Sequence, residues 1–311
     1  MKFKNTLLKF NRSIPFYHLP NKMKYYTLNA FAKTKEGGNP AGVVFDADNL
    51  SSQTRQEIAT KIGFSETAFV EKSDKANFKV TFFTPNGEVD LCGHATIATF
   101  FLMLKLNRIQ IGKYTQETKA GVLSIEATKD EIIFMNQNLP EFFEKIDKNE
   151  IADSLNISPD IISIDLPIQI VSTGLKDIFI PIKNLKSLFG IQPNFEKVAY
   201  ISKKYGTIGY HMFTLETMKN ATAHCRNLAP LYDIPEEPAT GTSSGALSCY
   251  LYKYGKISNK QVGNLVFEQG YSMNKPSEIL AQLKINCNEI TEVKVGGIAS
   301  NIQEQVMELK E

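Results

Sequence analysis

Two apolar stretches of similar design, residues 93–106 and 241–254, constrain the fold of this chain more than any other feature. Each follows a short polar segment, Asp90-Leu91-Cys92 before the first and Glu237-Pro238-Ala239-Thr240 before the second. A helix that is apolar nearly all round lies inside a protein, wrapped by other elements. The first backbone N–H groups of such a helix lack intrahelical partners and can bind an anion. We therefore expect two similar halves, each presenting a helix start to a small acidic ligand.

Composition and charge exclude several classes of protein. The chain has 311 residues, 42% of them hydrophobic, and its 35 basic residues nearly balance 33 acidic ones. A net charge of +2 gives no electrostatic basis for binding nucleic acid, and the chain has no apolar run long enough to span a membrane. The four cysteines have neither CxxC nor metal-site spacing, so we expect no metal, no disulfide scaffold and a cytoplasmic location.

The predicted secondary structure contains more strands than helices. Helices are expected at residues 51–62, 93–106, 148–155, 194–204 and 241–254. Strands are expected at residues 24–31, 41–45, 65–70, 78–84, 121–127, 131–135, 168–173, 177–182, 207–215, 221–228, 264–269 and 292–295. This order favours an α+β protein with two lobes, each a sheet curled around one apolar helix. Residues 1–22, which are basic, are interpreted as an N-terminal extension whose removal should leave activity intact.

Glu66, His94 and Cys92 are the first candidates for chemistry. Glu66 interrupts an otherwise apolar predicted strand, so it is either a buried general base or a surface glutamate in ordinary alternation. His94 stands at a helix start, where the positive helix end disfavours protonation, and it is either a neutral acid–base group or a capping residue. The same helix end would lower the pKa of the Cys92 thiol and permit thiolate chemistry, although buried cysteines are more often inert.

The segment from Glu237 to Gly245 is a further candidate site. Gly241 and Gly245 permit close approach of the backbone, and the hydroxyl groups of Thr242 and its neighbours stand beside the free helix N–H groups. A carboxylate or a phosphate would fit there. No lysine follows, so the segment is not a Walker loop, and it is not a dinucleotide fingerprint. Taken alone, it could equally be an ordinary polar helix cap.

A series of motifs, running in order from about residue 23 to the C-terminus, resembles the PhzF-like isomerase family of phenazine biosynthesis. The motifs are Gly38-Asn39-Pro40-Ala41-Gly42-Val43-Val44, Ser65-Glu66-Thr67-Ala68-Phe69, Phe83-Thr84-Pro85, Cys92-Gly93-His94-Ala95-Thr96, Pro238-Ala239-Thr240-Gly241-Thr242 and Val295-Gly296-Gly297. The resemblance implies the diaminopimelate epimerase-like fold, with two pseudo-symmetric lobes and the active site in the cleft between them. Under this interpretation the first lobe comprises residues 23–118 and about 293–311, and the second comprises residues 119–292.

The resemblance also implies a cofactor-independent enzyme that is usually a homodimer. In that family a glutamate moves a proton between carbons of a cyclic amino-acid-like substrate, and Glu66 stands at the matching position. His94 matches the family histidine, and Glu237 would orient the substrate or exchange a proton with it. The list of expected substrate-binding residues is Ser65, Gly93, Gly241 and Thr242, and the backbone amides around the glycines would hold the substrate carboxylate.

Two departures from the family pattern bear on the substrate and the mechanism. The family often has Asp-Pro-Ala-Thr-Gly-Ser, whereas this chain has Glu237 and Thr242 at the two ends of that motif. The longer acid and the bulkier hydroxyl residue argue against the phenazine precursor itself as substrate. Related epimerases and racemases use two cysteines, and here Cys92 stands at the first position but Thr240 at the second. A racemase with two thiols is therefore disfavoured.

Three hypotheses follow for the function. The leading one is a cofactor-independent isomerase that moves a proton on a small, cyclic, amino-acid-like carboxylate, with Glu66 as its single acid–base group. The second is an epimerase, racemase or dehydratase of an amino or hydroxy acid, in which Cys92 works opposite Glu66 or Glu237. The third is a ligand-binding or scaffold protein that has kept the fold and lost turnover.

Overall fold

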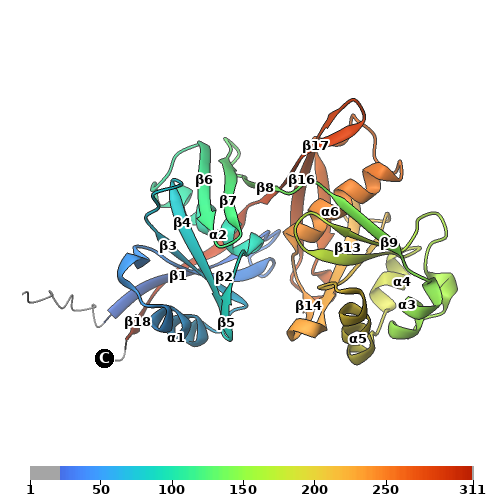
Figure 1. The fold of residues 1–311 in the computed structure, drawn as a ribbon, viewed down its shortest axis with the longest axis horizontal. Helices are drawn as coiled ribbons and strands as arrows, with labels where there is room; N and C mark the ends of the chain where they lie inside the picture. Colours follow the sequence, from blue (N-terminus) through green and yellow to red (C-terminus); the bar gives the residue numbers. More distant parts are fainter. Residues whose placement is uncertain (1–21, 310–311) are drawn as a thin grey trace, which may run out of the picture.

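The computed structural model describes residues 22–309 and confirms the expected α+β class (Figure 1). The expected N-terminal extension lies outside the described residues except for Lys22, with which the first strand begins. The ribbon forms two halves side by side, one containing α2 (Gly93–Lys105) and the other α6 (Gly241–Lys253). Within the described residues, no helix is both long and apolar enough to cross a membrane.

Most of the remaining elements of the described chain are strands. The other α-helices are α1 (Ser52–Ile62), α3 (Lys148–Ser154), α4 (Leu185–Gly190) and α5 (Phe195–Tyr205). The strands are β1 (Lys22–Ala30), β2 (Asn39–Val44), β3 (Glu66–Glu71), β4 (Phe78–Thr84), β5 (Gly87–Val89), β6 (Gly112–Thr118), β7 (Gly121–Ala127), β8 (Ile133–Gln137), β9 (Glu141–Lys145), β10 (Gln169–Ser172), β11 (Lys176–Pro181), β12 (Gly209–Thr214), β13 (Ala223–Ala229), β14 (Ile234–Glu237), β15 (Leu265–Gln269), β16 (Ser277–Asn286), β17 (Glu289–Gly297) and β18 (Ala299–Glu308).

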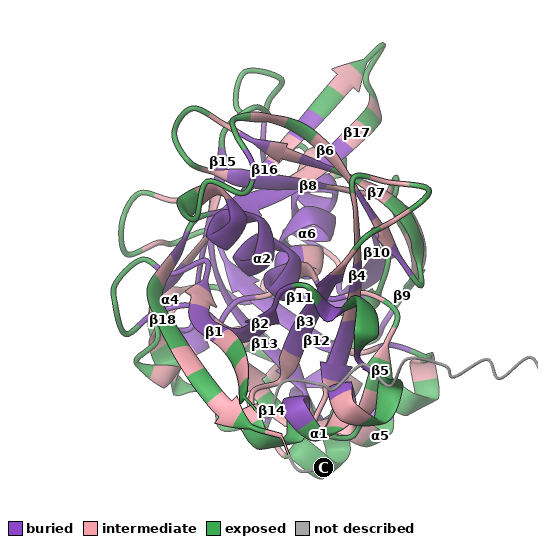
Figure 2. Ribbon diagram, turned by 90° about the vertical axis from the view of Figure 1, so that its left-hand side faces the viewer, coloured by how far each residue is buried: buried purple, intermediate pink, exposed green. Residues whose placement is uncertain are grey.

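The two apolar helices are the buried centres of the fold, as the sequence predicts. Every residue of α2 from His94 to Met103 is buried, and so is every residue of α6 from Ser243 to Leu251. Helix α2 packs against β1, β2, β3 and β8, and α6 packs against β10, β16 and β17. Figure 2 shows both helices in purple, enclosed by strands. Burial on every side explains why neither stretch carries a polar face.

Strand pairing links the two halves at the end of the chain. Strand β17 pairs antiparallel with β8, and β18 then pairs antiparallel with β1, so the C-terminal strand returns to the first strand. All the strands are connected by hydrogen bonding into one mixed sheet. How residues 23–118, 119–292 and 293–311 divide between lobes stays a prediction.

Both halves contain the same local unit, a helix that ends in a left-handed glycine and leads into a parallel strand. Gly63 is the C-cap of α1, and β3 begins three residues later and pairs parallel with β2. Gly206 is the C-cap of α5, and β12 begins three residues later and pairs parallel with β11. Both glycines have positive φ, 73° and 62°, which glycine adopts without strain. The first residue of β3 is Glu66, and the equivalent first residue of β12 is Gly209.

Several elements were not predicted from the sequence. Helix α4 and strands β5, β6, β9, β14, β16 and β18 lie in segments with no such assignment. Strand β18 is mostly exposed and polar, so it lacks an apolar pattern and is defined by its pairing with β1. Strand β16 does alternate buried and half-buried residues, which is a usable period-two signal that the sequence interpretation did not recognise.

Candidate active site

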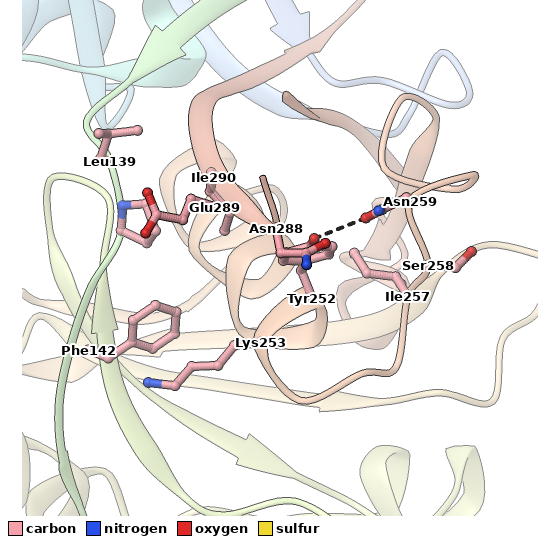
Figure 3. A pocket seen from close by; sticks show the side chains of 11 residues that line it. Leu139, Phe142, Tyr252, Lys253, Ile257, Ser258, Asn259, Asn288, Glu289 and Ile290 are labelled. Carbon is pink, nitrogen blue, oxygen red and sulfur yellow. Dashed lines mark hydrogen bonds between the residues drawn. The ribbon is translucent and has the colours of Figure 1, made fainter. Parts of the chain in front are cut away.

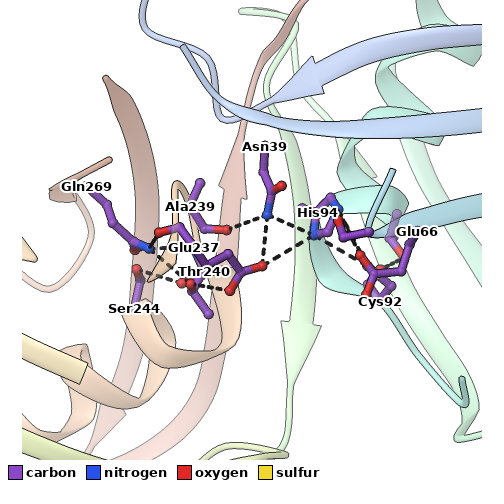
Figure 4. Close-up of polar contacts among 11 residues, drawn as sticks. Asn39, Glu66, Cys92, His94, Glu237, Ala239, Thr240, Ser244 and Gln269 are labelled. Atoms are coloured by element: carbon purple, nitrogen blue, oxygen red, sulfur yellow. Dashed lines mark hydrogen bonds and ion pairs between the residues drawn. The ribbon is translucent and has the colours of Figure 1, made fainter. Parts of the chain in front are cut away.

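Glu66 faces the interior beside His94. It is the first residue of β3, and its Oε2 lies 3.2 Å from His94 Nε2 (Figure 4). Its side chain is 16% exposed, and the residues that follow, Thr67 to Val70, are buried. The parallel register with β2 brings Glu66 opposite Ala41. This placement agrees with an inward-facing acid and not with a surface glutamate in simple alternation.

His94 occupies the first turn of α2 and lies between several polar groups. Ser65 Oγ lies 3.5 Å from Nε2, and Asn39 Nδ2 lies 3.3 Å from Nδ1. Burial lowers the pKa of His94, while the negative charge of Glu66 and the backbone of Pro40 oppose that shift. A neutral imidazole is therefore favoured, as the sequence predicts, although burial is the main cause.

Cys92 corrects an expectation about thiol reactivity. It is the N-cap residue of α2, it is buried, and its Sγ lies 3.4 Å from His94 Nδ1. Burial raises the pKa of the Cys92 thiol well above its ordinary value, and the negative charge of Glu66 adds to the rise, although the backbone of Ala95 opposes it. Of the two interpretations, a lowered thiol pKa is contradicted and the inert buried cysteine, which the sequence favoured, agrees with this environment, because desolvation outweighs the helix end.

Glu237 approaches His94 from the other half of the molecule. It ends β14, and its Oε1 accepts a hydrogen bond from Asn39 Nδ2 at 2.8 Å and lies 3.9 Å from His94 Nδ1. Its Oε2 accepts a hydrogen bond from Thr240 Oγ1 at 2.6 Å. Burial raises the pKa of Glu237 to about 7, assisted by the negative charge of Glu66 and opposed by the hydrogen bonds from Thr240 and Asn39. The acid therefore exchanges its proton near neutral pH.

Asn39 joins the two helix starts and Gln269 holds the segment before the second one, and the sequence interpretation missed both. Besides Glu237, the Asn39 amide donates to the carbonyl oxygen of Ala239 at 3.1 Å. Gln269 Nε2 donates to the Glu237 carbonyl oxygen at 2.7 Å, and Gln269 Oε1 accepts from the Thr240 N–H at 3.2 Å. By sequence Asn39 stands in a Gly-Gly-Asn-Pro segment typical of a turn, whereas the structure places it at the start of β2, and nothing near Gln269 in the sequence marks it as functional. Their roles depend on contacts between distant segments.

The predicted binding glycines begin the two buried helices. Gly93 and Gly241 are the first residues of α2 and α6, so their amides belong to the turns that lack intrahelical acceptors. A Cβ at Gly241 would lie 3.2 Å from Phe31 Cζ, which leaves little room for a side chain there. Thr242 follows in the same turn. The two helix starts face a common region through the contacts of Asn39 with Ala239 and His94.

Three side chains of the site are of the kinds that bind metal ions. The Glu66 carboxylate, the Cys92 thiol and the His94 imidazole each place one donor atom within 4.8 Å of the others. The sequence prediction of no metal considered only the spacing of the cysteines. It did not detect this set, because Glu66 is brought to the other two by the position of β3 beside α2.

A cavity of about 690 Å³ lies elsewhere, at the C-terminal end of α6 (Figure 3). Phe142 and Lys253 line it, with the Lys253 Nζ 3.7 Å from the centre of the Phe142 ring, and Tyr252 and Asn288 are also in the lining. None of the predicted site residues lines this cavity. Three groups with shifted pKa values, Cys92, His94 and Glu237, gather instead beside Glu66 at the helix starts, which makes that cluster the candidate active site.

Comparison with known proteins decides the family. The family model described as phenazine biosynthesis-like protein, PhzC-PhzF, matches residues 28–305. The chain belongs to this family. An uncharacterized isomerase of Clostridium acetobutylicum is 34% identical over 289 residues, which cover 89% of this chain and 95% of the relative. The trans-2,3-dihydro-3-hydroxyanthranilate isomerase of Pseudomonas chlororaphis is 26% identical, and the match covers 88% of this chain and 95% of that relative.

Solved structures agree with this assignment to the PhzC-PhzF family. The crystal structure of a PhzF-family phenazine biosynthesis protein from Bacillus anthracis has a TM-score of 0.84 and 30% identity, covering 93% of this chain and 99% of that one. A hydroxyproline epimerase from Agrobacterium vitis has a TM-score of 0.61 at 10% identity, and the match covers 93% of this chain and 94% of that one. The second likeness concerns the fold alone, which this PhzC-PhzF family member shares with an epimerase.

Proposed function

We propose that the protein is a cofactor-independent isomerase that moves a proton on a small, cyclic, amino-acid-like carboxylate, with Glu66 as its single acid–base group. The observation that carries the proposal is the 3.2 Å approach of Glu66 Oε2 to His94 Nε2 inside a cluster that also contains Glu237. Family membership supports the reaction class, because relatives of this chain are named isomerases.

In the proposed reaction, Glu66 takes a proton from a substrate carbon made acidic by a neighbouring carboxylate, imine or enamine group. It returns the proton to another carbon on the same face, which one base can do without a partner. The amides of Gly93 and His94 and those of Gly241 and Thr242 hold the carboxylate and stabilise the charge that develops on the substrate. Ser65, whose hydroxyl lies 3.5 Å from His94 Nε2, contacts the substrate near the base.

The repeated helix–strand unit supports a single base. Gly209 occupies in the second half the position that Glu66 occupies in the first. A Cβ at Gly209 would lie 1.8 Å from the Leu228 carbonyl oxygen, so no side chain fits there without moving the backbone. The second half therefore contributes Glu237, from a different strand, in place of an equivalent base. With a pKa near 7, Glu237 is suited to orienting the substrate or exchanging a proton with it.

The two alternative functions receive less support. Burial and a raised pKa keep the Cys92 thiol protonated, and Thr240 replaces the second thiol of a racemase, which counts against an epimerase, racemase or dehydratase using Cys92. Glu66, His94 and Glu237 form one connected cluster, which counts against a catalytically silent scaffold. The homodimer and the cytoplasmic location stay predictions.

The test is a proton-exchange screen in deuterated water against cyclic and linear amino acids and related carboxylates. We expect at least one cyclic compound to exchange a carbon-bound proton, and we expect Glu66→Gln to abolish that exchange while the protein stays folded. Glu57→Gln, on the exposed face of α1, is the matched control and should exchange at the wild-type rate. Full turnover by Glu66→Gln on an identified substrate would rule out the mechanism.

A further inference from the structure

We infer that Phe31 is a positioning residue of the active site, which holds the first turn of α6 where its backbone amides can bind the substrate carboxylate. Phe31 directly follows β1, which packs against α2, and its ring lies against the start of α6, the other buried helix. The effect on substrate binding rests on the proposed function. The placement of the helix start by Phe31 does not depend on it.

The backbone of Phe31 has a conformation that bulky residues avoid. Its φ is 60°, in the left-handed region, which is a genuine outlier for an aromatic side chain. Every other non-glycine residue with positive φ in the described chain is exposed, and most of them are asparagine or aspartate. Phe31, in contrast, is only 1% exposed. Strain of this kind persists where surrounding contacts fix the backbone, and it gathers at functional sites.

Two hydrogen bonds tie the strained backbone to the strands around α6. The Phe31 N–H donates to the Ile298 carbonyl oxygen at 2.8 Å, and the Phe31 carbonyl oxygen accepts from the Glu278 N–H at 2.9 Å. Glu278 belongs to β16, and Ile298 connects β17 to β18. Because β16 and β17 both pack against α6, the position of Phe31 is fixed relative to that helix.

The ring of Phe31 lies between two glycines. A Cβ at Gly297 would lie 2.7 Å from Phe31 Cδ1, and a Cβ at Gly241 would lie 3.2 Å from Phe31 Cζ. The ring therefore fills the space that a side chain at either glycine would need. This contact gives a role to Gly297, the last residue of the Val295-Gly296-Gly297 motif.

Phe31 acts on the substrate through Gly241. Gly241 begins α6, and its amide and that of Thr242 hold the substrate carboxylate in the proposed reaction. Without the ring, the first turn of α6 loses the surface on which it rests. A displacement of about 1 Å in a positioning group can cost on the order of 100-fold in rate. Glu66 and His94 lie on β3 and α2, so we expect the loss in substrate binding and not in the proton-transfer step.

The kinetic test compares Phe31→Ala with Phe100→Ala. Phe100 is a fully buried phenylalanine of α2 that packs against Phe78 and Tyr114, so it is the matched control for loss of a buried ring. For a compound that the proton-exchange screen identifies, Phe31→Ala should raise KM more than about 10-fold and change kcat less than about threefold. Phe100→Ala should leave both near the wild-type values.

A second measurement needs no substrate. Amide hydrogen–deuterium exchange, followed by mass spectrometry, reports local opening of the backbone in the native protein. Residues 239–246, which contain the start of α6, should exchange faster in Phe31→Ala than in the wild type. Residues 64–70, around Glu66, should not change. Phe100→Ala should leave residues 239–246 as they are in the wild type.

The strained backbone has its own test. Phe31→Gly should unfold at a higher urea concentration than Phe31→Ala, because glycine adopts a positive φ without strain and alanine does not. At an ordinary position the order is the reverse. Phe31→Leu keeps an apolar side chain and should give the same changes at α6 to a smaller extent, which preserves the test if Phe31→Ala does not fold.

Three results would overturn the inference. They are unchanged amide exchange of residues 239–246 in Phe31→Ala and Phe31→Leu, an equal rise in KM in Phe100→Ala, and a higher urea midpoint for Phe31→Ala than for Phe31→Gly. Proton exchange that is lost in Glu66→Gln but has an unchanged KM in Phe31→Ala would remove the positioning role alone. Faster amide exchange at the start of α6, with no compound exchanging a carbon-bound proton, would remove the proposed function alone.

Discussion

Asn39 Nδ2 donates a hydrogen bond of 2.8 Å to Glu237 Oε1, joining residues 198 positions apart in the chain. Asn39 begins β2 beside the first helix start, and Glu237 ends β14 before the second. The same amide contacts His94, so the acid of one half and the histidine of the other share a single donor. Asn39 is therefore a positioning residue for both.

Replacing Asn39 should move the acidity of Glu237. The Asn39 hydrogen bond opposes the rise in the pKa of Glu237, so Asn39→Ala should raise that pKa further above 7. It also leaves buried acceptors unpaired, at a cost of about 1–3 kcal/mol in unfolding free energy. The pH profile of exchange should shift upward. Asn29→Ala, which removes a hydrogen bond to the Gly37 carbonyl oxygen, is the control, and an equal pH shift in both variants would contradict the assignment.

Cys92 and Cys287 should differ in their reactivity toward alkylating reagents. Cys92 is buried with a raised pKa, whereas Cys287 is exposed. Alkylation of the native protein should therefore modify Cys287 first, with Cys92 slower by more than about 100-fold. Mass spectrometry of digested samples taken over time measures both rates. Preferential labelling of Cys92 would favour the thiol mechanism instead.

Asp177 should make stability depend on pH. It is buried in β11, accepts a hydrogen bond from Ser243 Oγ, and burial raises its pKa from 3.8 to about 6. Because the folded state holds this proton more tightly than the unfolded state, the contribution to stability falls as pH rises from about 4 to about 6. At pH 8 the penalty amounts to about 3 kcal/mol.

Asp177→Asn removes that penalty and keeps an acceptor for Ser243. We expect it to stabilise the protein at pH 8 and to have little effect at pH 4, as measured by urea unfolding at both values. Asp165→Asn, at an exposed position, should change neither. Destabilisation of Asp177→Asn at pH 8 would show that the carboxylate form is needed there.

Gly245 should not tolerate a side chain. A Cβ there would lie 2.4 Å from Gln137 Oε1 and 2.9 Å from Val295 Cγ1, so both side chains would have to shift, and Gln137 would lose its hydrogen bond from Thr173 Oγ1. Gly245→Ala should cost about 1–3 kcal/mol in unfolding free energy, the usual range for overpacking. Gly190→Ala meets no atom within 4 Å and should change stability by about 0.5 kcal/mol or less. Equal effects of the two would contradict the close contact.

Local patterns were sufficient to predict the two central helices. Both helices begin at the predicted glycines, because a long apolar run after small polar residues has few other stable solutions. Either Ser51 or Ser52 can cap α1 by sequence, and the structure selects Ser51, which accepts a hydrogen bond from the Thr54 N–H. Strands such as β18 were missed because their stability comes from a distant partner.

The amino-acid sequence by itself determined the fold class, the two buried helix starts and the candidate residues Glu66, His94 and Glu237, because these depend on local pattern and on the family motifs. Only the tertiary structure decided how the residues meet. It placed Glu66 against His94, buried the Cys92 thiol so that its pKa rises, and joined Glu237 to Asn39. Desolvation and hydrogen bonding across the two halves arise from segments far apart in the chain, and no local pattern encodes them.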